Sequence, residues 1–445
     1  MSRVAQAVVS EANPEPVRAT RSAWWWIPSL YFGQGIPYVV VMTLSVIMYK
    51  NLDISNTDIA LYTSWLYLPW VIKPLWSPFV DLFRTKRLWI VTLQLVIGAS
   101  LALVALTLPM AHFFQITLAV FWLMAFSSAT HDIAADGFYM LALEQYQQAA
   151  FVGVRSTFYR VAMIAGQGGL VFLAGQLGEH TGDVTFAWSI VFLILAVMFL
   201  ALFVYHRFIL PVPPGDQPAA KGSNVLDGFI STFSSFFKQK DILVVLAFLL
   251  LFRFGEAQAL KLVAPFLLDP GSKGGLGLTT SDVGLVYGTI GVIALTLGGL
   301  LGGYAISCHG LKRWLWPMLL SVHLPNIAFV YLAFAMPGNI FLIATAIAVE
   351  QFGYGFGFAA YLLFMIMVAS RENEQDEGRH KTAHYAICTG FMALGMMLPG
   401  MASGWIQEQL GYQNFFVWVC IATLPSLVAA AFVKIDPQFG RKAAG

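Results

Sequence analysis

The stretch "LPVPPGDQPAAKGSNVLDGFISTFSSFFKQK" (210–240) is the one long polar break in this chain. Its proline, glycine and serine residues are typical of a linker, because these residues interrupt regular helices. Inside it, "DGFISTFSSFF" (227–237) indicates a short helix that lies on a membrane surface. Long apolar runs lie on both sides of the break, so their number decides the fold.

The composition places nearly all of the chain in a lipid bilayer. Of 445 residues, 58% are hydrophobic and only 11% are charged, whereas roughly 25% are charged in soluble proteins. The mean hydropathy is +0.72. A membrane-spanning helix needs about 20 mostly apolar residues. The sequence predicts twelve such spans, six on each side of the break, at roughly 23–49, 57–81, 87–109, 112–143, 149–177, 184–209, 241–268, 280–306, 313–336, 339–369, 380–406 and 413–434.

The distribution of lysine and arginine predicts the orientation. One side of the membrane receives the N-terminus and most of the basic loop residues, while the other receives little beyond Lys50 and Lys273. Basic residues concentrate in cytoplasmic loops, so both termini are expected in the cytoplasm. The predicted organisation is a cytoplasmic tail (1–22), a six-helix bundle (23–209), a cytoplasmic linker (210–240), a second six-helix bundle (241–434) and a C-terminal tail (435–445).

Charge and cysteine content exclude several classes of partner. The formal net charge is only +2, so nothing points to nucleic acid. The three cysteines are far apart, with no CxxC pair and no histidine at zinc-binding spacing. We therefore expect no metal, no disulfide and no cofactor.

Three short segments recur in the same order in both parts of the chain. "TDIAL" begins at 57 and "SDVGL" at 281, 224 residues later. "TKRLW" (85–89) is followed by "LKRWLW" (311–316), and "YFGQG" (31–35) by "RFGEA" (253–257), at nearly the same offset. Two parallel six-span repeats describe the major facilitator architecture, whose binding site lies between the halves near the membrane midplane.

Two motifs then resemble a known family. "YLPWVIKPLWSPFVDLFRTKRLW" (67–89) and "THDIAADGFYM" (130–140) are similar to the second and fourth spans of the AmpG-like muropeptide permeases, and "LYFGQGIPY" (30–38) fits the same branch. That branch also contains acetyl-CoA and drug transporters. His131 departs from the glutamine usual in the second motif. The resemblance implies proton-driven import of anhydromuropeptides, by a monomer in the bacterial inner membrane.

The second motif carries two acids inside an apolar helix, where ionised groups are costly and mark functional candidates. Asp132 and Asp136 are four residues apart and share one helical face. Lys73 or Arg160 could lie opposite them as the neutralising cation. Two interpretations stay open: one aspartate carries the transported proton, or both belong to a buried ion-pair network.

The seventh span offers a second group of charges. Arg253 and Glu256 are three apart and can pair, and Lys261 lies further along. Arg253 or Lys261 could bind a substrate carboxylate, and Gln34 is the repeat partner on the first span. The expected substrate-binding set is Gln34, Tyr38, Lys73, Arg160, Arg253 and Lys261, with Tyr38 stacking on a sugar ring.

The proton-coupling candidates are Asp132, Asp136, Glu256 and Glu350. His131 and His384 are either proton relays or hydrogen-bonded core residues. In major facilitators, charges at the cytoplasmic ends of spans 2, 4 and 11 form gates. The resemblance assigns such a gate to Asp81, Arg84 and Arg87.

Other classes compete with this interpretation. A membrane acyltransferase lacks a visible nucleophile motif here, a channel does not need buried charges of both signs, and a primary pump lacks a nucleotide motif. Among transporters, a siderophore, a drug or acetyl-CoA are alternative cargoes.

Overall fold

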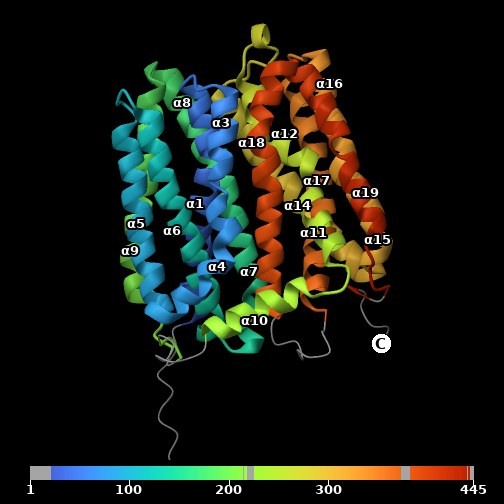
Figure 1. Cartoon of the computed structure of the whole chain (residues 1–445). Coiled ribbons are helices and arrows are strands. Elements are labelled where there is room, and N and C mark those ends of the chain that lie inside the picture. The colour runs from blue at the N-terminus through green and yellow to red at the C-terminus, as the bar shows by residue number, and fades with distance from the viewer. Residues whose placement is uncertain (1–21, 214, 218–224, 372–380, 438, 441–445) are drawn as a thin grey trace, which may run out of the picture.

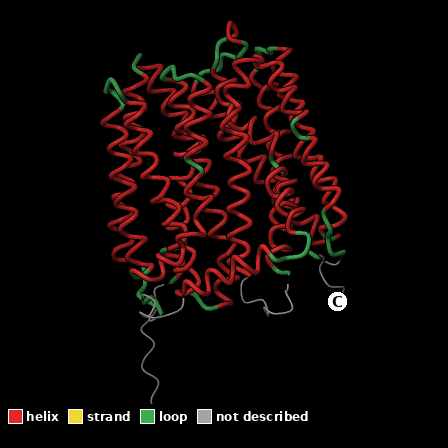
Figure 2. Tube along the Cα trace, viewed as in Figure 1, coloured by secondary structure: helices red, strands yellow, loops and turns green. Residues whose placement is uncertain are grey.

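The computed structural model describes residues 22–213, 215–217, 225–371, 381–437 and 439–440. All regular structure in these residues is helical, and the helices are joined by short loops (Figure 2). The long helices run side by side in one bundle (Figure 1). Outside the described residues lie nearly all of the predicted tail 1–22, positions 438 and 441–445 of the predicted tail 435–445, and part of the predicted linker.

Two groups of helices flank the linker. The helices before it are η1 (Ala23–Trp25), α1 (Ile27–Val39), η2 (Val40–Leu44), α2 (Ser45–Asn51), α3 (Asn56–Trp65), α4 (Leu68–Phe83), α5 (Lys86–Thr107), α6 (Phe113–Ala142), α7 (Gln145–Ile164), η3 (Ala165–Leu170), α8 (Val171–Thr181) and α9 (Val184–Ile209). Those after it are α10 (Val225–Phe237), α11 (Ile242–Leu251), α12 (Phe254–Leu268), η4 (Gly271–Lys273), α13 (Thr280–Val283), η5 (Gly284–Gly291), α14 (Val292–His309), α15 (Leu311–His323), η6 (Leu324–Asn326), α16 (Ile327–Ala335), α17 (Ile340–Ala369), α18 (Lys381–Ile421) and α19 (Leu424–Phe432).

The predicted all-helical membrane fold is confirmed. Within the described ranges, ten helical stretches are long and apolar enough to cross a membrane. One of them, Ala383–Phe432, contains 50 residues and bends at Gly411, whose φ of 71° interrupts the helix, so it holds two of the predicted spans. The predicted span at 57–81 coincides with α3 and α4. The count of twelve and the position of the termini remain predictions.

The linker contributes a helix where one was expected. α10 lies across the lower end of the bundle in Figure 1. Phe236 is buried, whereas Ile230 is 63% exposed. A helix with one buried and one exposed apolar side fits the predicted position at a membrane surface.

The repeated segments "TDIAL" and "SDVGL" have the same local cause. Ser55 accepts a hydrogen bond from the backbone N–H of Asp58 and begins α3. Thr279, 224 residues later, accepts one from Asp282 and begins α13. A hydroxyl at this position satisfies one of the N–H groups that a helix start leaves unpaired. The repeated sequence therefore corresponds to a helix N-cap in each half of the chain.

The two halves approach most closely at glycines in π-helical turns. Gly168 in η3 lies against Gly288 in η5. A Cβ atom added to Gly288 would lie 2.0 Å from the carbonyl oxygen of Gln167. Small residues permit such backbone contact between membrane helices, and no larger residue fits without separating η3 from η5.

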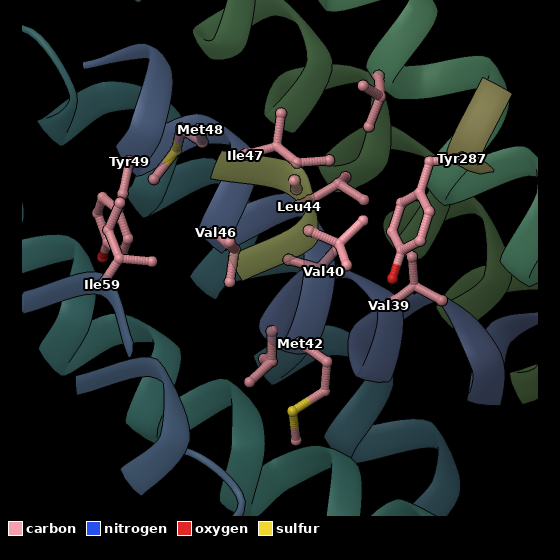
Figure 3. Packing of buried hydrophobic residues seen from close by; sticks show 14 of the residues in the cluster. Val39, Val40, Met42, Leu44, Val46, Ile47, Met48, Tyr49, Ile59 and Tyr287 are labelled. Atoms are coloured by element: carbon pink, nitrogen blue, oxygen red, sulfur yellow. The ribbon is translucent and has the colours of Figure 1, made fainter. Parts of the chain in front are cut away.

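The main apolar core also contains residues of both halves. Val39 to Tyr49 supply side chains from α1, η2 and α2, and Tyr287 of η5 belongs to the same cluster. Figure 3 shows Tyr287 close to Val39, across the boundary between the halves. The halves are thus packed together in this structure.

Gly288→Ala is expected to destabilise this packing, because overpacking a tight contact costs typically about 1–3 kcal/mol. The measurement is the melting temperature of the purified protein in detergent. Gly169→Ala is the matched control, since a Cβ there meets no atom within 4 Å. Equal melting temperatures for the two variants would contradict the assignment of a close contact.

Candidate functional site

The two acids of the α6 motif are neutralised separately. The Nζ of Lys73 on α4 lies 3.7 Å from Oδ2 of Asp132. The indole N–H of Trp70, one turn earlier on α4, donates to the same oxygen at 3.1 Å. The predicted pairing of Lys73 with Asp132 is confirmed, and α4 thereby fixes the orientation of α6.

Asp136 has a different partner from the one expected. A guanidinium nitrogen of Arg155 on α7 lies 2.8 Å from its Oδ1, and Tyr31 donates to that oxygen at 3.4 Å. The guanidinium carbon also lies 4.5 Å from the ring centre of Tyr31 and 5.1 Å from that of Tyr139. Arg155 is held by one carboxylate and two aromatic faces, an arrangement that suits a planar cation.

Of the two cations considered for these acids, Lys73 is the one that pairs with Asp132, and Arg160 lies elsewhere. Residues 155 and 160 are five apart, which turns their side chains roughly 140° from each other on a helix. Arg160 instead reaches Gly299 of α14, where a Cβ would lie 3.6 Å from one guanidinium nitrogen. Its predicted role in substrate binding is not tested by this position.

The pair predicted on the seventh span is present. Arg253 donates to Glu256 through Nε at 2.6 Å and through an Nη at 3.0 Å. Both side chains are buried, and the guanidinium also lies over the rings of Tyr354 and Phe358. Arg253 occupies the break between α11 and α12, where its φ of −107° ends one helix before the next begins.

Lys261 lies deeper on α12 and joins the halves. Its Nζ donates to Oγ1 of Thr63 on α3 at 2.9 Å and lies 5.0 Å from the ring centre of Tyr67. Among the described residues no carboxylate lies within 4.0 Å of it. Its ammonium is therefore paired with neutral groups alone.

Glu350 is a buried acid that, like the base Lys261, has no oppositely charged partner among the described residues. It is 5% exposed on α17 and accepts a hydrogen bond from the neighbouring Gln351 at 2.8 Å. In the described part of the chain no lysine, arginine or histidine nitrogen lies within 4.0 Å of its carboxyl oxygens. A buried carboxylate without a cation is costly, so a proton bound to Glu350 would remove a buried charge.

The predicted residues of the first span lie beside this charged region. Gln34 is buried next to Asp132, and its Oε1 has no hydrogen-bond partner among the described residues. Tyr38 packs edge-on against Trp70, with ring centres 5.5 Å apart. An unpartnered carbonyl and an aromatic pair are groups that a sugar or an amide can contact.

The predicted gate is described only in part. The side chain of Asp81 lies outside the described residues. Arg84 is exposed at the end of α4. Arg87 donates to the backbone carbonyls of Arg207 and Leu210 at the end of α9. A cation at a helix C-terminus is a stabilising feature, so Arg87 joins α5 to α9, and a gating role for these residues stays a hypothesis.

Polar side chains close the bundle at the end opposite α10 (Figure 1). Lys50 pairs with Asp269 at 2.7 Å across the two halves. Asn56 donates to Gln407 at 2.7 Å and to Tyr412 at 2.8 Å, and Tyr412 donates to Asp269 at 2.6 Å. These residues, here called the outer network, border a cavity of about 760 Å³. Sequence reasoning missed the network, although Lys50 stood out as one of two basic residues predicted on that side.

The two predicted histidines are hydrogen-bonded. His131 lies 3.2 Å from the amide nitrogen of Gln94, whose oxygen accepts from His206 at 2.9 Å. His384 lies 2.8 Å from the hydroxyl of Ser235. These contacts agree with the interpretation of both as core residues. No group of three metal-ligating side chains occurs in the residues that the structure describes.

Comparison with known proteins agrees with this architecture. The solved structure of the nucleoside transporter NupG covers 92% of this chain with a TM-score of 0.66 at 18% identity, over 98% of its own chain. A bacterial homologue of the human lysosomal transporter Spinster, in an inward-facing and unoccupied conformation, covers 93% with a TM-score of 0.66 at 13% identity, over 96% of its own length.

Residues 29–375 match the model of the Major Facilitator Superfamily, and the chain belongs to that family. It is therefore a multi-pass membrane transporter rather than an enzyme. It resembles the AmpG-like members: a putative transporter AmpG 4 of Rickettsia conorii is 23% identical over 90% of this chain and 94% of its own. The anhydromuropeptide permease of Escherichia coli K12 is 23% identical over 93% of this chain and 80% of its own.

Replacing Lys73 by Gln is expected to destabilise the protein, because it leaves the Asp132 carboxylate without its cation. Leaving a buried polar partner unsatisfied costs about 1–3 kcal/mol. The double variant Lys73→Gln/Asp132→Asn should recover much of the lost melting temperature, since both charges are then removed. Additive losses in the two single variants would show that the pair does not interact.

Asp269→Asn is expected to loosen the outer network and to populate conformations that are open at that end. Losing a charge pair worth about 1–3 kcal/mol shifts a two-state ratio roughly five- to a hundredfold. The measurement is the distance distribution between spin labels at positions 180 and 273, both exposed, in a background without native cysteines. Asp53→Asn, an exposed acid on the same face, is the control. Identical distributions for the two variants would exclude a role in closure.

Proposed function

We propose that this protein imports anhydromuropeptides into the cytoplasm by proton symport, as a monomer in a bacterial inner membrane. The observation that carries the proposal is a pair of buried, unneutralised groups, Glu350 and Lys261, in a chain that resembles an anhydromuropeptide permease over most of its length. The first can hold a proton and the second can hold a carboxylate. Proton and anionic sugar peptide would then enter together.

The proton site is assigned to Glu350 in preference to the other acids. Asp132, Asp136 and Glu256 each have a cation within 4.0 Å. In each of these three pairs the charge of the carboxylate is balanced by a cation of this chain. Glu350 lacks that support, and the cost of its charge changes with the access of water to the site.

Aromatic and amide groups beside the charges suit the rest of the substrate. Tyr38, Trp70 and Tyr67 lie on the first-half side of the boundary between the halves, and Tyr354 lies on the other. Rings of this kind stack on sugars through an apolar face and hydrogen-bond through a polar edge. The Gln34 carbonyl would accept from a substrate amide or hydroxyl.

The outer network supports a conformation in which the bundle is closed at one end. Lys50, Asn56 and Asp269 join the halves at the end opposite α10. If the predicted orientation holds, this end faces the periplasm and the structure corresponds to a state closed on that side. Import then requires the network to break and re-form in each cycle.

A substrate with several negative charges would find few cations that are not already paired. Acetyl-CoA would require a group of free cations for its phosphates. Lys73, Arg155 and Arg253 are each committed to a carboxylate of this chain. The balance of charge favours a cargo with few anionic groups, although a siderophore or a drug of that kind remains the alternative.

The test is uptake of radiolabelled anhydromuropeptide by proteoliposomes with and without an imposed pH gradient. Accumulation that requires the gradient is expected. Absence of uptake by folded protein, with uptake of a siderophore or a drug under the same conditions, would overturn the choice of substrate.

Glu350→Gln is expected to abolish gradient-driven accumulation and to preserve exchange of labelled for unlabelled substrate, because the amide resembles a protonated carboxyl. Asp53→Asn should behave as wild type in both assays. If Glu350→Gln accumulates substrate normally and Asp132→Asn does not, the proton site lies on α6.

A further inference from the structure

Lys261 differs from Arg253, which is the other buried cation among the described residues, and from the partly buried Lys50, Lys73 and Arg155. Lys50, Lys73, Arg155 and Arg253 each contact a carboxylate, whereas Lys261, at 2% exposure, contacts a hydroxyl and an aromatic ring. Burying an ammonium without an opposite charge costs several kcal/mol. The remaining N–H groups of Lys261 thus call for an anion that this chain does not supply from its described residues.

Thr63 positions this ammonium and has no proton left for a ligand. Its hydroxyl donates to the carbonyl oxygen of Ile59 at 2.7 Å and accepts from Lys261. Hydroxyls inside helices commonly donate to the carbonyl four residues earlier. Thr63 therefore fixes Nζ at a defined place on the boundary between the halves.

Ser64, the next residue, supplies the complementary donor. It is fully buried, and its Oγ has no hydrogen-bond partner among the described residues. Unlike Thr63, it does not donate to the preceding turn. A buried hydroxyl without a partner loses free energy unless a ligand completes it.

Gly400 on α18 lies beside the serine and the lysine. A Cβ added to Gly400 would lie 2.7 Å from Oγ of Ser64 and 3.4 Å from Cγ of Lys261. Both side chains therefore lie against Gly400 and close to each other, and a Cβ at 400 would have to displace the Ser64 hydroxyl. Three elements, α3, α12 and α18, meet there and belong to both halves of the protein.

From this geometry we infer a binding site for one carboxylate, held by the ammonium of Lys261 and the hydroxyl of Ser64 and positioned by Thr63. One carboxylate oxygen accepts from Nζ and the other from Oγ. The site rests on the proposed function only for the source of the carboxylate, which there is the substrate; a small free anion shares the chemistry.

The site also couples binding to the position of the halves. Lys261 belongs to the second half, and Ser64 and Thr63 belong to the first. A carboxylate bound between them bridges α12 and α3 on the side of the outer network. It holds best when the halves are closed there, as in this structure.

The experiment is a thermal-shift titration of the full-length protein with three probes: anhydromuropeptide, the same compound with its carboxylates converted to amides, and sodium acetate. Wild type should be stabilised by the carboxylate compounds and not by the amide. Lys261→Gln and Ser64→Ala should each weaken that binding roughly ten- to a hundredfold, and Lys261→Arg should retain part of it. Lys312→Gln, an exposed lysine, is the matched control.

The outcomes separate this inference from the proposed function. Muropeptide binding that depends on Lys261 and Ser64 supports both. A Lys261-dependent response to acetate alone supports an anion site and removes the substrate as its source. Muropeptide uptake and binding that are unchanged in Lys261→Gln and Ser64→Ala would overturn the site and leave the proposed function standing. Gly400→Ala, whose methyl group would displace the Ser64 hydroxyl, provides an independent variant if either substitution prevents folding.

Discussion

The cost of a charge in hydrocarbon determines how this molecule is arranged. Each charged side chain in the apolar helices must find a partner, and the partners come from neighbouring helices: Lys73 for Asp132, and Arg155 for Asp136. These pairs fix the rotation of α6 against α4 and α7. Among the fully buried ionisable groups that the structure describes, Glu350 and Lys261 have no oppositely charged partner within 4.0 Å, and the proposed proton and substrate sites rest on them.

Much of the fold could be predicted because its signals are local. Apolar runs of sufficient length defined the helices. The caps at Ser55 and Thr279 belong to short segments that recur in both halves of the sequence. The pairing of Arg253 with Glu256 followed from their spacing on one helix. The pairing of Asp132 with Lys73 followed from their positions on adjacent spans.

Contacts set by rotation about a helix axis could not be predicted in this way. Arg155 and Arg160 lie on one helix and are separated from the two acids by similar numbers of residues in the sequence. Only the packed structure shows that Arg155 faces Asp136. The outer network could not be predicted either, because Asn56, Asp269 and Tyr412 come from segments more than 100 residues apart in the sequence. Neutral residues such as Ser64 and Gly400 carry no signal in the sequence at all, since their importance lies in what surrounds them.

The location of the ion pairs has a consequence for biosynthesis. Asp132, Lys73, Asp136 and Arg155 all belong to the first half of the chain. A ribosome delivers that half to the membrane before the second half exists, and its acids can be neutralised at once by cations already made. Lys261 differs because it belongs to the second half, whereas Thr63, its hydroxyl partner, belongs to the first half and is synthesised earlier. Both ion pairs of α6 can therefore form before the second half is made, whereas Lys50 and Lys261 find their partners only when the two halves meet.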